Sequence, residues 1–183
     1  MANGTLKVEN IQTSSGSGTI TLGQSGETIT IPTGTTVSGA MSSTPAFEAI
    51  RSGTQSIANT TAVKVEYDSE IFDTDSAYDN STNYRFTPQV AGKYFCFAQI
   101  MMNYGGSDFN DLQVRIHKNG TLALHTRNRF TYYNSVYAAG ILDLNGSTDY
   151  IEAFCYQAAG GAINVDGGTD NKTRFGAYRI IGA

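Results

Sequence analysis

The feature that most constrains this chain is a series of short runs in which apolar and polar residues alternate. Leu112 to His117 is such a run, and Thr121 to Leu124 follows it directly after Lys118-Asn119-Gly120. Alternation with a period of two indicates a strand with one buried face, and Asn-Gly between two such runs is a strong hairpin signal. Further runs of this kind are Val63–Tyr67, Tyr84–Phe86, Gly92–Ile100, Val136–Leu144, Tyr150–Tyr156 and Phe175–Ile181. With no helical period beside them, they predict an all-β sandwich or jelly roll.

Composition divides the chain into residues 1–44 and 45–183. All Phe and Tyr residues, 9 and 11 in number, follow Pro45. The first part is rich in Gly, Ser and Thr, and two runs in it, 18–23 and 27–32, alternate Thr with Ile or Leu. Such runs cannot bury their apolar face alone, because repeat units need neighbours to form a core. We therefore expect a short Gly/Thr-rich β stem in an oligomer, with a disordered linker as the alternative. Its expected core residues are Ile20, Leu22, Ile29 and Ile31.

The charge balance limits the classes of partner. The formal net charge is -4, only 15% of residues are charged, and there is no basic run, so we expect no nucleic-acid partner. No apolar stretch reaches the ~20 residues of a membrane-spanning helix.

Enzyme machinery is sparse, and we predict no enzyme, no cofactor and no metal. Cys96 and Cys155 lie in apolar or aromatic surroundings, which favours buried thiols over a Cys-His nucleophile. Counting outward from the Asn-Gly turn predicts that Val114 faces His125 and that His117 and His125 lie on opposite sides of the hairpin. They would then not share a metal ion. The acidic stretch 68–79 is interpreted as a solvated loop, with Ca²⁺ binding as the alternative.

The second face of the run 92–100 is unusually apolar. Tyr94, Cys96 and Ala98 would point into the sandwich, which leaves a face that cannot remain in water as a contiguous patch. An oligomer contact would bury that face, and coverage by a neighbouring loop is the alternative. The predicted interface residues on this face are Phe95, Phe97 and Met101.

Two loops are candidates for recognition of a host cell-surface glycan or protein. The segments 103–110 and 127–134 combine aromatic, amide and Arg side chains. Tyrosine rings can stack on sugars while amides bond hydroxyl groups. The candidate contact residues are Tyr104, Arg129, Tyr132 and Tyr133, with packing of the aromatic residues between protomers as the alternative.

Residues 45–183 resemble the C1q/TNF-like jelly-roll family. The order of the matching fragments carries the resemblance: Pro45-Ala46-Phe47, Tyr78-Asp79, Tyr84 to Pro88, Gly92 to Cys96, Val114 to Gly120, Leu142 to Ile151, and Phe175 to Tyr178. Cys96 stands where the family has Phe, and Ser147-Thr148 replace a Gly before Asp149. The resemblance implies a ten-stranded jelly-roll sandwich that forms a compact homotrimer.

The N-terminal segment is similar to the openings of short fibre or appendage proteins of tailed bacteriophages, especially marine ones. The resemblance implies a non-enzymatic virion structural protein, a fibre or capsid-decoration protein with its head exposed for host attachment. We therefore expect a virion surface appendage, assembled in the host bacterial cytoplasm and bound to other virion proteins through its N-terminus. A cellular C1q-like recognition or signalling module is the alternative, but it would need an export signal that Met1 to Thr13 does not resemble.

Overall fold

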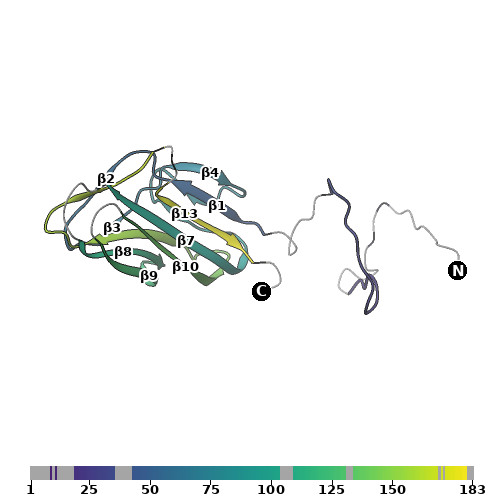
Figure 1. The fold of residues 1–183 in the computed structure, drawn as a ribbon. Helices are drawn as coiled ribbons and strands as arrows, with labels where there is room; N and C mark the ends of the chain where they lie inside the picture. The colour runs from purple at the N-terminus through teal and green to yellow at the C-terminus, as the bar shows by residue number, and fades with distance from the viewer. Residues whose placement is uncertain are drawn as a thin grey trace. The chain divides into compact units, whose positions relative to one another are not determined.

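The computed structural model describes residues 9, 11, 19–35, 43–103, 109–130, 134–168, 170 and 172–180. Within these ranges the chain forms thirteen β-strands and no helix (Figure 1). The strands are β1 (Ala46–Ile50), β2 (Gln55–Ile57), β3 (Val63–Lys64), β4 (Ser69–Asp73), β5 (Tyr78–Asp79), β6 (Arg85–Phe86), β7 (Ala91–Asn103), β8 (Phe109–Lys118), β9 (Thr121–Phe130), β10 (Asn134–Asn145), β11 (Ile151–Gln157), β12 (Ile163–Val165) and β13 (Arg174–Arg179).

The strands form two sheets that pack as a jelly-roll sandwich. One sheet has seven strands in the order β2-β12-β7-β13-β1-β4, with β10 pairing with β7. The other has six in the order β5-β6-β11-β8-β9, with β3 pairing with β11. All strand pairs are antiparallel, so the predicted all-β class and two-sheet jelly roll are confirmed.

The described residues hold more strands than the ten expected. The difference comes from residues 55–86, which break into five short strands, β2 to β6. Asp73 and Asp79 interrupt this stretch, because their carboxylates accept hydrogen bonds from nearby backbone N–H groups such as those of Tyr78 and Thr82. Such local bonds compete with a strand ladder.

The core lies between the sheets and follows the predicted alternation. On β7 the side chains of Tyr94, Cys96, Ala98, Ile100 and Met102 are fully buried. They meet Leu112, Val114 and Ile116 of β8 and an aromatic cluster around Phe47. The Phe47 ring stacks on Tyr78 at 4.6 Å and on Phe86 at 4.5 Å and meets the edge of Phe175 at 5.1 Å. Burial of these large rings dominates the energetics of the core.

The predicted Asn-Gly hairpin joins β8 to β9. Asn119 and Gly120 have φ angles of 52° and 76°, as a turn with two left-handed residues requires. Lys118 pairs with Thr121 and His117 with Leu122, which confirms the expected register next to the turn.

Farther from the turn the expected register is wrong. Ile116 pairs with Leu124, so Ala123 is an extra residue on β9. A bulge of this kind shifts the pairs beyond it by one, here from Ile116 to Leu112. Arg115, not Val114, therefore faces His125, and the two histidines share one face of the sheet instead of lying on opposite faces.

The chain divides into two compact units, Met1–Val37 and Ser38–Ala183. In the described part of the first unit, residues 19–35 form turns and extended backbone without strand pairing, and all are exposed. Ile20, Leu22, Ile29 and Ile31 have exposed fractions between 42% and 59%. The predicted strands 18–23 and 27–32 therefore do not pair within a single chain, and the β stem stays a prediction about an oligomer.

Candidate functional site: the outer face of β10, β7 and β13

Strands β10, β7 and β13 lie side by side, and their register aligns apolar residues on the outward side. Phe95 of β7 pairs with Ile141 of β10 and with Tyr178 of β13. Residues that face each other across antiparallel strands point to the same side of the sheet. Because Tyr94 and Cys96 are buried in the core, this row points away from it.

The next row continues the apolar surface. Phe97 pairs with Ala139 and Gly176, and a Cβ atom at Gly176 would lie 2.5 Å from Phe97 Cζ and 2.8 Å from the Phe47 carbonyl oxygen. The Phe97 ring therefore lies close over the Gly176 backbone. Glycine is needed there because any larger residue would displace the ring.

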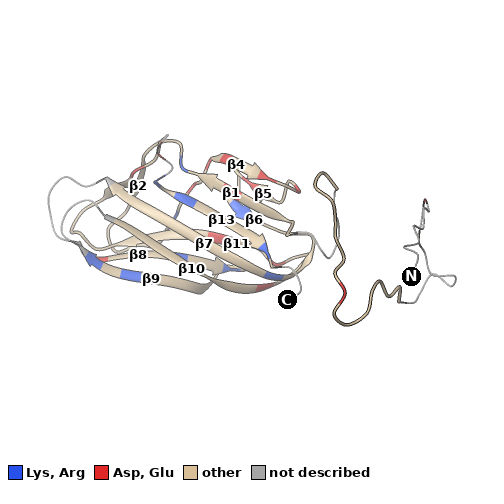
Figure 2. Ribbon diagram, turned by 45° about the vertical axis from the view of Figure 1, so that its right-hand side comes forward, with Lys and Arg blue, Asp and Glu red and all other residues tan. Residues whose placement is uncertain are grey.

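These rows form one contiguous apolar surface, which we call the β7 face: Phe95, Phe97, Tyr137, Ala139, Ile141 and Tyr178. Tyr137, Ile141 and Tyr178 are 48%, 57% and 45% exposed. The Phe95 ring centroid lies 5.4 Å from that of Tyr178, and the Phe97 centroid lies 6.4 Å from that of Tyr137. Figure 2 shows the middle of β7 and β10 without charged residues. Contiguous exposed apolar patches are typical of surfaces that another molecule covers.

The predicted interface residues lie where the alternation placed them. Phe95 and Phe97 are on the outward side, half-buried by their neighbours. Met101 is on the same side but pairs with Ser135, beyond the aromatic rows. Tyr137, Ile141 and Tyr178 were missed because the alternation assigns sides of a strand and does not show which distant strands become neighbours.

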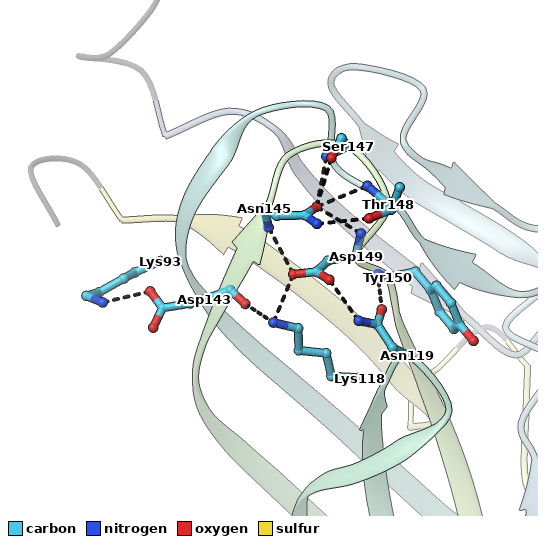
Figure 3. Close-up of polar contacts among 9 residues, drawn as sticks. All are labelled: Lys93, Lys118, Asn119, Asp143, Asn145, Ser147, Thr148, Asp149 and Tyr150. Carbon is cyan, nitrogen blue, oxygen red and sulfur yellow. Dashed lines mark hydrogen bonds and ion pairs between the residues drawn. The ribbon is translucent and has the colours of Figure 1, made fainter.

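A polar network closes one end of the β7 face (Figure 3). Lys93 donates to Asp143 Oδ1 at 2.7 Å, and Lys118 Nζ donates to the Asp143 carbonyl at 2.6 Å and pairs with Asp149 at 2.9 Å. Asn119 Nδ2 donates to Asp149 at 2.7 Å. The Asn-Gly turn is therefore tied to the connection between β10 and β11.

Electrostatics in this network favour an ionised Asp149. The hydrogen bonds from Lys118 and Asn119 lower the pKa of the Asp149 carboxyl from its usual value of 3.8. Asn145 adds a backbone N–H at 3.0 Å, and its own side-chain oxygen accepts backbone hydrogen bonds from residues 147–149. These contacts hold the loop in place, and each polar group already has a partner within the fold.

The two thiols are structural. Cys96 and Cys155 are free and buried, and burial raises the pKa of each thiol to about 12. A thiol of that pKa is not ionised near neutral pH and is not a nucleophile.

Three carboxylates of the acidic stretch 68–79 bond to separate partners. Asp68 pairs with Arg51 at 2.6 Å, Asp73 accepts from the Tyr78 backbone, and Asp79 accepts from residues 81–83. Among the described residues, no three His, Cys, Asp or Glu side chains are placed to hold a metal ion. This arrangement favours the solvated loop over the calcium site.

The predicted recognition residues fall largely outside the described ranges. Tyr104, Tyr132 and Tyr133 lie there, so their role stays a prediction. Arg129 lies near the end of β9 and is exposed. In the described part of the chain, no helix has the length and apolar character needed to cross a membrane.

Comparison with solved structures identifies the fold. Eiger TNF from S. frugiperda superposes with a TM-score of 0.53 at 13% identity, over 75% of this chain and 93% of that one. Murine APRIL, solved at pH 5.0, superposes with a TM-score of 0.53 at 14% identity, over 74% of this chain and 98% of that one. The jelly-roll sandwich of this chain therefore has the TNF-like fold. At the level of sequence, no protein-family model and no curated protein matches. At such low identity the likeness concerns the fold alone.

Proposed function

We propose that this chain is a non-enzymatic binding protein that assembles as a homotrimer through the β7 face. The observation that carries the proposal is the alignment of Ile141, Phe95 and Tyr178 in one exposed row across three strands. Such a row is costly to leave in water and gains free energy when a second protein surface covers it. A second copy of the chain is always present as a partner, and homo-oligomers with cyclic symmetry are common.

A trimer is preferred because of the fold. The resemblance to the C1q/TNF-like family implies three subunits, and the superposed structures share the two-sheet jelly roll with this head. In a cyclic trimer the β7 face of one subunit would contact a different surface of the next, since such interfaces join two unlike patches.

A binding role is preferred to catalysis. The thiols of Cys96 and Cys155 are buried and protonated, and three carboxylates of the acidic stretch, those of Asp68, Asp73 and Asp79, bond to local partners. A nucleophile without a positioned base has no means of activation.

The finer part of the proposal is a trimeric fibre or decoration protein of a tailed bacteriophage. Its support is the similarity of the N-terminal segment to phage appendage proteins, together with four exposed apolar residues, Ile20, Leu22, Ile29 and Ile31. In a trimeric stem these side chains would face the three-fold axis. The head would then stand away from the particle and contact the host surface.

Light scattering tests the assembly, and particle analysis tests the location. The protein should have three times the chain mass of 19.6 kDa at micromolar concentration. Immunogold labelling of purified virions should mark a surface appendage. A trimer that is absent from virions and bound to a cellular receptor would instead support a cellular C1q-like module, the candidate favoured by the similarity to TNF and APRIL.

A further inference from the structure

A polar groove lies over strands β5 and β6, at the edge of the six-stranded sheet. Its volume is about 320 Å³, and Ala77 and Tyr78 are among its lining residues. This volume is at the lower end of the range found for small-ligand sites. Its polar lining residues are Ser76, Asp79, Asn83, Arg85, Thr87 and Gln89.

The walls of this β5–β6 groove are rigid. Asp79 accepts hydrogen bonds from the backbone N–H groups of Ser81 at 3.1 Å, Thr82 at 2.9 Å and Asn83 at 3.1 Å. These bonds lower the pKa of the Asp79 carboxyl well below its usual range, so it is ionised under ordinary conditions. On the other side, the Thr87 backbone donates to the Ala77 carbonyl at 2.7 Å. The loop between the strands is therefore fixed before any ligand arrives.

Backbone strain is concentrated at the groove. Ser76 and Tyr84 have φ angles of 52° and 49°, in the left-handed region that residues other than glycine rarely adopt. Ser76 lines the groove, and Tyr84 lies between the lining residues Asn83 and Arg85. Strain of this kind persists only where the surrounding structure imposes it, and it gathers at binding sites.

Arg85 supplies unused hydrogen-bond donors. Its guanidinium carbon lies 4.6 Å from the centroid of the Tyr150 ring, which holds the side chain in a fixed plane. Within the described ranges, the Arg85 guanidinium makes no ion pair and no hydrogen bond. The Thr87 hydroxyl likewise makes no hydrogen bond there. A planar guanidinium with five N–H donors pairs best with two adjacent oxygen atoms.

We propose that the β5–β6 groove binds a neutral saccharide unit. Adjacent hydroxyl oxygens of the sugar would accept hydrogen bonds from Arg85. The amide nitrogens of Asn83 and Gln89 already donate to Asp79 Oδ2 and to the Thr87 carbonyl, so their amide oxygens would accept hydrogen bonds from further hydroxyl groups. A neutral ligand is preferred to an anion because the ionised carboxylate of Asp79 lines the groove. The inference rests on the recognition part of the proposed function, yet it does not depend on the trimer.

Titration of the ¹⁵N-labelled full-length protein with methyl glycosides of glucose, galactose and N-acetylglucosamine tests this site. At least one glycoside should cause saturable shift changes at the backbone amides of residues 76–89. Arg85→Gln should weaken that binding by about tenfold or more, since a charged donor is lost. The matched control is Arg115→Gln, since the Arg115 guanidinium also lies over a tyrosine ring, 4.7 Å from the Tyr156 centroid, but outside the groove; it should leave the affinity unchanged.

Three results would overturn the inference. They are the absence of saturable shifts with every glycoside, binding that Arg115→Gln removes and Arg85→Gln preserves, and binding of glucuronate without binding of any neutral glycoside. Light scattering on the same samples reports the oligomer separately. A monomer that binds sugar through Arg85 would therefore refute the proposed trimer and support the saccharide site. A trimer that binds no sugar would support the proposed assembly and refute the saccharide site.

Discussion

Replacing Ile141 by Asp tests the β7 face most directly. The side chain is 57% exposed in the single chain, so the change should leave the fold of the subunit intact. Complete burial of an isoleucine contributes about 1.5–3 kcal/mol, so the exposed part would add about 1–2 kcal/mol per subunit on assembly. Over three subunits the loss is about 3–6 kcal/mol, and desolvation of three carboxylates adds several kcal/mol more.

The readout is the mass in solution. Because about 1.4 kcal/mol is a factor of ten in an equilibrium constant, the variant should lose at least two powers of ten in trimer stability. Light scattering at micromolar concentration should show the wild-type protein as a trimer and Ile141→Asp as a monomer with a cooperative thermal transition. Leu122→Asp is the matched control, since Leu122 is 44% exposed on β9 of the other sheet. A monomeric wild type, or an intact Ile141→Asp trimer, would refute the reasoning.

Three further outcomes are expected. The pKa of Asp149 is lowered in the fold from its usual value of 3.8. Its carboxylate therefore stabilises the protein when the pH is above 3.8, and this contribution is lost as the pH falls below that value. Urea unfolding should show that Asp149→Asn is destabilised at pH 7 and that the difference from the wild type vanishes in acid. Gly176→Ala should lower the free energy of unfolding by about 1–3 kcal/mol in chemical denaturation, because the new Cβ meets a ring and a carbonyl; Gly161→Ala, with open space around the added atom, should not. Burial raises the pKa of Cys96 and Cys155 to about 12, so a thiol reagent at pH 8 should label neither until the protein is unfolded, and rapid labelling of the native protein would contradict this.

The strands could be predicted from the sequence because their signal is local. The run Gly92 to Ile100 became the central part of β7, and the run Val136 to Leu144 became most of β10. In both, the side that is buried follows from the period of two. The Asn119-Gly120 turn was predictable for the same reason, since both residues tolerate a positive φ.

Only part of the candidate site could be predicted, because the residues that flank Phe95 in the sheet are distant from it in the sequence. Alternation placed Phe95 on the outward side, but nothing local shows that Ile141 and Tyr178 would flank it. The bulge at Ala123 was also hidden, since no glycine marks it. That single extra residue reversed the expected side of His125.

The two outer faces of the sandwich differ in what covers their aromatic rings. On the six-stranded sheet, the Arg115 guanidinium lies 4.7 Å from the centroid of the Tyr156 ring, and His117 stacks on Phe154 at 4.3 Å. Those rings are shielded by cationic or polar side chains of the same subunit, which keep the surface compatible with water. On the β7 face, the Phe95 ring instead lies beside the rings of Phe97 and Tyr178 and pairs with Ile141. The proposed subunit contact therefore falls on the seven-stranded sheet, whereas the β5–β6 groove lies at the edge of the six-stranded sheet.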